Sequence, residues 1–580
     1  MPESPAEKPP FDAWNPGLTS ALPPRLLPLV TLFRPENSDV GYADAKEAAD
    51  FCGLPVEELC ALKTERLVVH EVLIRVTADL SVPDGPSYEY LGLQLRGMVD
   101  RLYRHYMVPQ MDDISAAFDA VCDQAGTVLD RLVSDAFDQG AGKTAVSRGF
   151  LGRFFRPKVQ APVTDVDLAN GWRNRLGAAD DLTEACLLAL LAVADGIMGK
   201  QGKMVRDKAL ITRLALRVFR NDYGSRAVGH IIAPLFVEAA KAEGYRFLPA
   251  QTDPIVMNTK GASASGKSTI RPKQRMLAEK MGILWEDFAL ISPDYWRKYL
   301  LDYASMGDDY KYAAMLTGRE LEFVDKKLDR YMAQKASEGT VPHLLIDRFR
   351  FDSFKTDSEG EAKSTLLSRF GSTVFLFFIV TPPAATVERA WQRGLTTARY
   401  KAVDDLLYHN IEAFTGIPQL FFSWMAIKGK KVYFEFLDND VPIGELPRTI
   451  AFGRNDHMTI LDPVALSNID RFKEVNIAAT AANEVLDQNW KPTYRFLLEC
   501  KSMFANLDFA NYETAGVYGR VRVGQWFYKN ELAMPVDHLN SGFLAAIGWQ
   551  EQPKPKKMKV EKVNMMDEKR ITLGAWGNDA

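Results

Sequence analysis

Cysteine is scarce in this sequence of 580 residues, and its placement excludes two kinds of cross-linked module. The cysteines form no CxxC pair and are Cys52, Cys60, Cys122, Cys186 and Cys500. An odd number of isolated thiols argues against a disulfide framework and against a zinc knuckle. We therefore expect a reducing, cytoplasmic compartment of bacterial type, with export as an effector left open.

Strong net charge and long apolar runs are also lacking. The formal net charge is −4 at pH 7, so nothing global attracts the chain to nucleic acid or to an anionic membrane. No apolar run reaches the roughly 18 residues of a membrane helix, and we expect no Sec-type signal, because residues 1–10 have no cationic region leading into an apolar one. We expect no membrane association and no nucleic-acid partner, and any anion site must be local.

The length allows three or four domains at roughly 150 residues each, and 47% hydrophobic residues are enough for large cores. Apolar spacing is helical in the first half of the chain. The expected segments are a Pro-rich disordered tail over 1–25, a helical domain over 26–145, a basic linker around Arg148 to Lys158, a helical bundle over 160–245, an α/β domain over 248–455, and a mixed region over 456–580 with a helix over 475–486 and a basic tail over 554–562.

From Leu248 onward, short apolar runs alternate with helical stretches, which is typical of βαβ units and a parallel sheet. The expected strands are Pro254–Asn258, Phe288–Ile291, His343–Ile346, Val374–Val380 and Lys431–Leu437. The fold class predicted is an α/β doubly wound parallel sheet, preceded by a mostly α-helical N-terminal half and followed by a mixed C-terminal region.

One stretch matches the phosphate-loop pattern G-x-x-x-x-G-K-S, follows an expected strand and opens an expected helix. Its residues are Gly261, Ala262, Ser263, Ala264, Ser265, Gly266, Lys267 and Ser268. In such loops Lys267 would neutralise the β and γ phosphates of ATP, and Ser268 would bind Mg²⁺. Thr269 is a candidate α-phosphate contact or simply a first-turn helix residue. The pattern predicts ATP and Mg²⁺ as cofactors.

Charged residues follow the other expected strands, at the sheet edge where ligands bind in doubly wound folds. Asp294 could accept the proton of an attacking hydroxyl, and Arg297 could hold an anionic group of the substrate. The alternative is a helix cap with an i+3 ion pair. Asp347 is a candidate metal and substrate residue, with Arg348 as a candidate substrate contact; the alternative is a turn in which the two residues pair.

An arginine-rich stretch follows the fourth expected strand. Arg389, Arg393 and Arg399 could close over transferring phosphates, with Arg393 catalytic, because clustered cations stabilise the charge of the transition state. Arg389 and Arg393 share a helix face and repel each other unless an anion lies between them. The alternative is a solvated cationic face.

The order of these motifs, from the phosphate loop to Asp294-Tyr-Trp-Arg297, the arginine-rich stretch and Asp438-Asn439, resembles the zeta-toxin family of P-loop kinases. The resemblance covers roughly a third of the chain. It implies a P-loop kinase-like fold and transfer of the γ-phosphate of ATP to a sugar hydroxyl. It also implies acceptors such as UDP-N-acetylglucosamine or NAD-type dinucleotides. Asp294 would be the general base, and Glu320 and Glu322 are candidates for the acidic acceptor motif of the family.

Three functions remain open at this point: a kinase with a small-molecule phosphate acceptor, an NTPase or nucleotide-binding switch, and a polynucleotide kinase. A carboxylate facing a second hydroxyl favours the first, and the net charge disfavours the third. The helical N-terminal half is a candidate site for a protein partner.

Overall fold

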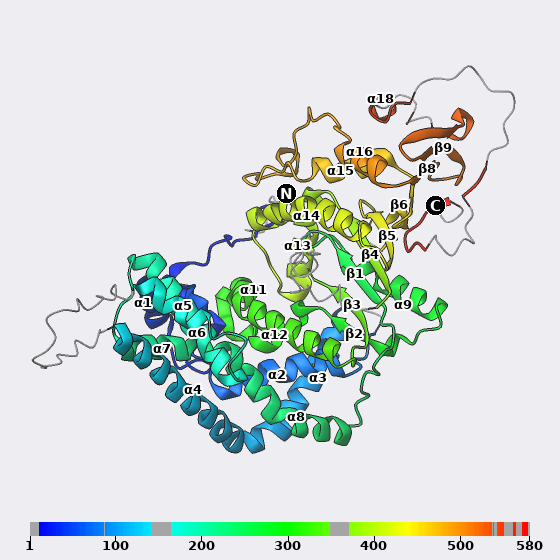
Figure 1. Ribbon diagram of the computed structural model, residues 1–580. Coiled ribbons are helices and arrows are strands. Elements are labelled where there is room, and N and C mark those ends of the chain that lie inside the picture. The colour runs from blue at the N-terminus through cyan, green and yellow to red at the C-terminus, as the bar shows by residue number, and fades with distance from the viewer. Residues whose placement is uncertain are drawn as a thin grey trace, which may run out of the picture.

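The computed structural model describes residues 11–85, 88–140, 164–348, 371–442, 444–535, 538, 542–549, 561–563 and 571–577. The basic linker around Arg148 to Lys158 and residues 554–560 of the basic tail lie outside these ranges. Figure 1 shows a long mixed sheet with the helical N-terminal half below it and the last strands of the sheet at its upper end.

The N-terminal half is helical, as predicted. Its helices are α1 (Tyr42–Cys52), α2 (Thr64–Asp79), α3 (Tyr88–Leu102), α4 (Met111–Gly140), α5 (Asp165–Arg173), α6 (Asp181–Gln201), α7 (Lys208–Phe219) and α8 (Ser225–Ala242). Side-chain caps begin several of them, for example Asp180, which accepts from the Thr183 backbone N–H before α6. Helix α4 packs against α6, α7 and α8, so the two expected helical regions share one core.

Helix α6 is the one helix of the described residues that is long and apolar enough to cross a membrane. Half of its most apolar window is buried, and it packs against α1, α4, α5 and α7.

One ten-stranded sheet, in the order β10-β9-β8-β7-β6-β5-β4-β1-β3-β2, runs through the second half of the chain. Its strands are β1 (Val256–Lys260), β2 (Phe288–Ile291), β3 (His343–Asp347), β4 (Thr373–Val380), β5 (Lys431–Asp438), β6 (Arg448–Arg454), β7 (His457–Ile460), β8 (Asn506–Ala510), β9 (Val517–Arg522) and β10 (Gln525–Lys529). The five strands predicted from the sequence are present as β1 to β5, and their pairings with one another are parallel.

The sheet is longer and less uniform than the sequence predicts. Strands β6 and β7 pair antiparallel on either side of residue 455, so the sheet continues through the expected domain boundary. Most of the remaining pairings are antiparallel, and only β7 and β8 are parallel. Mixed sheets of this kind carry antiparallel strands beyond a parallel core.

Helices connect or flank these strands. They are α9 (Arg271–Lys280), α10 (Arg297–Leu300), α11 (Ala313–Leu316), α12 (Gly318–Ser337), α13 (Pro383–Thr397), α14 (Val403–Met425), α15 (Pro463–Arg471), α16 (Arg495–Met503) and α18 (Phe543–Ala546). The prediction of a helix over 475–486 is wrong, because only a 3₁₀ turn at Ala482–Glu484 forms there. Asn476 and Glu484 accept hydrogen bonds from nearby backbone N–H groups, which competes with a helical ladder.

The expected disordered tail over 1–25 is wrong for residues 11–25, which pack against the core, and residues 1–10 lie outside the described residues. The Trp14 indole donates to Glu388 at 2.8 Å, and Arg25 makes a two-bond ion pair with Asp309. Ala13 is buried with Val387 and other apolar residues of α13 and α14. Proline prevents regular structure in this segment, but its few large apolar side chains still find sites on the core.

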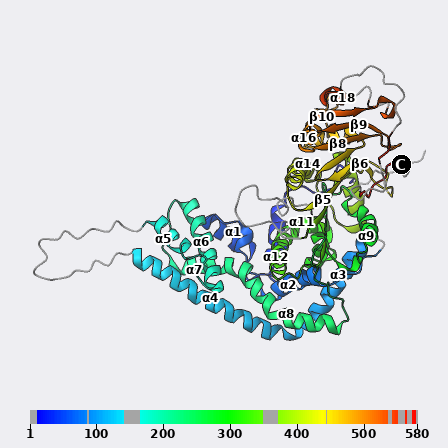
Figure 2. The ribbon, with the colours of Figure 1, turned by 45° about the vertical axis from the view of Figure 1, so that its right-hand side comes forward.

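Helix α2 joins the helical half to the sheet. It is buried along nearly its whole length and packs against β2, α8 and α12. Figure 2 shows α2 between α12 and α8. Such a helix must pair the polar groups that it buries.

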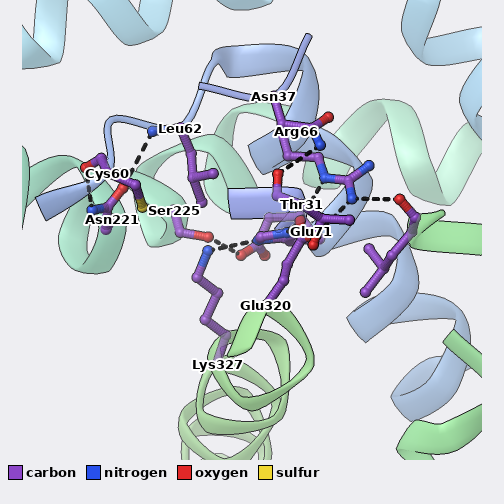
Figure 3. A network of polar contacts seen from close by, with 12 residues as sticks. Thr31, Asn37, Cys60, Leu62, Arg66, Glu71, Asn221, Ser225, Glu320 and Lys327 are labelled. Carbon is purple, nitrogen blue, oxygen red and sulfur yellow. Dashed lines mark hydrogen bonds and ion pairs between the residues drawn. The ribbon is translucent and has the colours of Figure 1, made fainter. Parts of the chain in front are cut away.

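An ionic cluster between α2 and α12 pairs polar groups that α2 buries (Figure 3). Glu320 of α12 is fully buried, and its Oε2 accepts from Arg66 Nη2 at 2.7 Å. His70 Nε2 lies 2.7 Å from Glu320 Oε1, while Lys327 Nζ lies 2.9 Å from His70 Nδ1. Burial and the charge of Lys327 lower the pKa of His70 to about 3, so a neutral ring accepts from Lys327 and donates to Glu320.

We predict that Glu320→Ala destabilises the protein by about 3–5 kcal/mol, because it leaves Arg66 buried without its counter-ion. The exposed Glu322 of the same helix, which pairs with Arg319, provides a matched control. Its replacement by Ala should cost well under 1 kcal/mol. Urea unfolding of both variants measures the difference, and equal losses would show that the cluster does not join the two halves.

Candidate functional site

The order in which the chain connects the strands indicates which edge of the sheet is the expected ligand site. The chain runs from β1 outward to β2, returns to β3, and then crosses to β4 and β5 on the other side of β1. Ligands of open α/β sheets bind at such a reversal, beyond the carboxyl ends of the strands. A cavity of about 520 Å³ lies there, and residues 264–269 of the loop after β1 line it.

The two glycines of the loop are required by its shape. Gly266 has φ of +91°, and a Cβ there would come within 2.3 Å of the Asn439 side-chain nitrogen. A Cβ on Gly261 would lie 3.0 Å from the Ile379 carbonyl oxygen. Ala264 also has positive φ, at 60°. The loop therefore combines left-handed turns with close backbone packing, which glycine permits.

The loop is tied to the two strands that follow it in the sheet. The carbonyl oxygen of Ser265 accepts hydrogen bonds from Thr381 Oγ1 at 2.9 Å and from Asn439 Nδ2 at 2.7 Å. Thr381 directly follows β4, and Asn439 directly follows β5. The turn after the loop is a 3₁₀ helix, Lys267–Ile270, before α9 begins. Pro272 explains this, since its ring would clash with the Ser268 carbonyl in a continuous α-helix.

Lys267, Asp294 and Asp347 face the same cavity. Lys267 Nζ donates to the carbonyls of Ala262 at 3.0 Å and Gly261 at 3.3 Å. Burial lowers the pKa of Lys267, and the charges of Asp347 and Asp294 oppose this shift. Ser268 and Asp347 both line the cavity, whereas Ser263 is not among the lining residues.

Asp294 lies in a 3₁₀ turn after β2 and is held by two arginines. Its Oδ1 is 3.1 Å from Arg297 Nε, and its Oδ2 is 2.6 Å from Arg399 Nη2. The side chain stays 43% exposed and lines the cavity. Burial would raise the pKa of Asp294, but the charges of Arg399, Arg297 and Arg393 outweigh it and hold the pKa well below its usual range. The carboxylate is therefore ionised at neutral pH.

Helix α13 supplies further cations. Arg389 and Arg393, one turn apart, both line the cavity. Arg389 donates to the carbonyls of Asn439 at 2.7 Å and Val441 at 3.2 Å. Arg399, just beyond the end of α13, reaches Asp294 instead. The arginine-rich stretch is thus directed at the cavity rather than being a solvated face.

Several predicted site residues lie elsewhere. Arg348 is buried against Asp325 and Asp329 of α12, so the expected substrate contact and the alternative pair with Asp347 are both wrong. Glu320 is held in the ionic cluster with Arg66. Arg297 is not among the lining residues. Its Nη1 donates to the Ala314 carbonyl and to Thr317, which makes it a support for Asp294.

Other lining residues were not anticipated from the sequence. Gln392, Thr396 and Thr397 of α13 line the cavity, and their helical spacing from Arg389 and Arg393 could have indicated them. Asn439, by contrast, belongs to the Asp438-Asn439 motif already recognised at a strand end, and it lines the cavity. Glu89, which lies in the helical half, has no sequence signal that points to this cavity.

Comparison with known proteins gives little further guidance. No family model matches the chain, and no curated protein matches it. One similar solved structure comes from work on the PezAT chromosomal toxin–antitoxin system of Streptococcus pneumoniae. It has 16% sequence identity and a TM-score of 0.24, over 36% of this chain and 76% of that chain. Because this TM-score is low, the functional interpretation depends on the geometry of the cavity.

We predict that Gly266→Ala destabilises the protein by about 2–3 kcal/mol, because it combines positive φ with a clash against Asn439. Gly429 has a similar φ of +85° but open space around the missing Cβ, so Gly429→Ala is the matched control. It should cost only about 1 kcal/mol. Urea unfolding compares the two variants, and identical losses would contradict the packing of Asn439 on the loop.

Proposed function

We propose that the protein is an ATP-dependent phosphotransferase that moves the γ-phosphate of ATP to a hydroxyl of a small molecule, in the manner of the zeta-toxin-like P-loop kinases. The observation that carries this proposal is that the phosphate-loop residues and the ionised Asp294 face one cavity. A nucleotide switch needs the loop but does not need a second carboxylate beside it.

The loop fits a polyphosphate. Left-handed residues at Ala264 and Gly266 shape a backbone concavity of the kind that binds anions. Lys267, Arg389 and Arg393 add positive charge around it. Without a nucleotide, such a concentration of cations is unfavourable, and a triphosphate would neutralise it. The 520 Å³ volume is in the range of nucleotide-sized pockets.

Mg²⁺ fits as an ion that enters with the nucleotide. Among the described residues, no group of three or more His, Cys, Asp or Glu side chains could hold a metal by itself. Mg²⁺ in phosphate-transfer sites uses one or two protein ligands together with phosphate oxygens and water. Ser268 and Asp347 would be those ligands. The ion would neutralise charge on the β and γ phosphates.

Asp294 would orient the acceptor and receive its proton. The acceptor hydroxyl oxygen attacks the γ-phosphorus, the bond to the β–γ bridging oxygen breaks, ADP leaves, and the hydroxyl proton passes to Asp294. Two arginines make Asp294 a weak base, which suits a loose transition state in which orientation matters more than basicity. Arg393 would stabilise the charge on the transferring phosphate.

The proposal is tested by incubating the protein with γ-labelled ATP, Mg²⁺ and a deproteinised cell extract, and in parallel with UDP-N-acetylglucosamine or NAD. We expect label on a small-molecule acceptor. Label appearing only as free phosphate would replace the proposal with an NTPase, and no consumption of ATP would reject both.

We predict that Asp294→Asn lowers kcat by about 100-fold or more and changes the KM for ATP by less than about threefold, because the carboxylate acts on the acceptor proton. Asp308, which is exposed in the 3₁₀ helix Ala304–Tyr312, provides the control variant Asp308→Asn, which should transfer at the wild-type rate. Steady-state transfer kinetics measure both. An Asp294→Asn protein with the wild-type kcat would remove Asp294 from the reaction.

A further inference from the structure

The cavity is not built by the α/β region alone. Glu89, in the first turn of α3, lines it together with the phosphate loop and Asp294. Within the described residues, the Glu89 carboxylate makes no hydrogen bond and no ion pair. A half-buried carboxylate in a cation-rich cavity is thus available to a ligand.

Helix α3 is fixed relative to Asp294. Its Gly92 packs so closely on Tyr295 that a Cβ would lie 2.6 Å from the ring. Arg96, one turn further along, donates from Nη1 to the Tyr295 carbonyl at 3.2 Å. Tyr295 directly follows Asp294, so the position of Glu89 is set by the same turn that presents Asp294.

A second connection holds the segment before α3. Asp84 lies 3.5 Å from Arg271 Nη1, and both side chains are buried. Arg271 also donates to the Tyr295 hydroxyl at 3.1 Å, and the Trp285 indole donates to Asp84 at 3.3 Å. Arg271 begins α9, directly behind the phosphate loop. The segment before α3 is therefore held by Arg271 of α9 and by Trp285.

Glu89 lies on the same helix as Gly92 and Arg96, both of which contact Tyr295 beside Asp294. Burial lowers the pKa of Arg96 and of Lys298; the charge of Glu89 opposes this shift and the charge of Arg399 adds to it, which is consistent with Glu89 lying near these three cations. Arg399 contacts Asp294. Pro442 and Glu445 also line the cavity and follow β5 in the chain. They come shortly after Asn439 and Val441, whose carbonyls accept hydrogen bonds from Arg389.

We propose that α3 of the helical half forms the acceptor wall of the cavity and that Glu89 binds two neighbouring hydroxyls of a sugar in the phosphate acceptor. This inference rests on the proposed phosphotransferase function. Each oxygen of an ionised carboxylate can accept a hydrogen bond from one of two adjacent hydroxyls. Burial from water strengthens such charge-assisted bonds. The helical half then acts in substrate recognition, and Glu89 determines specificity without touching the transferring phosphate.

The test is transfer kinetics with UDP-N-acetylglucosamine and NAD, both of which carry neighbouring hydroxyls. Glu89→Gln keeps the size of the side chain but loses the charge and one acceptor oxygen. We expect the KM for the acceptor to rise about 10- to 100-fold, while kcat and the KM for ATP change less than about threefold. Asp100→Asn, at an exposed acid further along α3, is the control and should match the wild type.

The outcomes separate the two proposals. No transfer by the wild-type protein to any acceptor rejects the phosphotransferase function and this inference with it. Transfer by the wild type with an unchanged acceptor KM in Glu89→Gln rejects only the inference. Transfer confined to acceptors without neighbouring hydroxyls also rejects it. A fall in kcat with an unchanged KM would show that Glu89 acts on the reaction rather than on acceptor binding.

Discussion

The site depends on two hydrogen bonds that the carbonyl oxygen of Ser265 accepts. The donors are Thr381 and Asn439, which follow β4 and β5 respectively. Asn439 also packs against Gly266, and its own carbonyl accepts from Arg389 of α13. One residue thus fixes both the loop and a cation that faces it. Displacing Asn439 would move both together, because buried polar contacts of this kind have few alternative partners.

The helical half also contributes to the site. Helix α2 is buried between β2, α8 and α12, and its ionic cluster with Glu320 is almost entirely buried as well. Through this packing α3 reaches Tyr295 and carries Glu89 to the cavity. In the proposed phosphotransferase, one set of contacts would bind the nucleotide and another the acceptor. The two sets would then come from halves of the chain that are distant in sequence.

The parts that could be predicted from the sequence depend on local patterns. Short apolar runs gave β1 to β5, and the glycine and lysine spacing gave the loop, because strand burial and loop shape are encoded within a few residues. Asp294 was found from its place after a strand. The features that could not be predicted depend on partners distant in the sequence. Arg348 forms an ion pair with Asp325 of α12 instead of lining the cavity, and Glu89 reaches the cavity only through tertiary packing. The absent helix over 475–486 reflects side chains that bond their own backbone.

The central claim is that the cavity after β1 binds a magnesium nucleoside triphosphate through the loop. Calorimetric titration with Mg²⁺ and a non-hydrolysable ATP analogue tests it directly, with Lys267→Ala for comparison. The account predicts one analogue bound per chain and an affinity at least about tenfold weaker in the variant, because a charge-assisted contact to phosphate is lost. No binding to the wild type, or equal binding to both proteins, would contradict it.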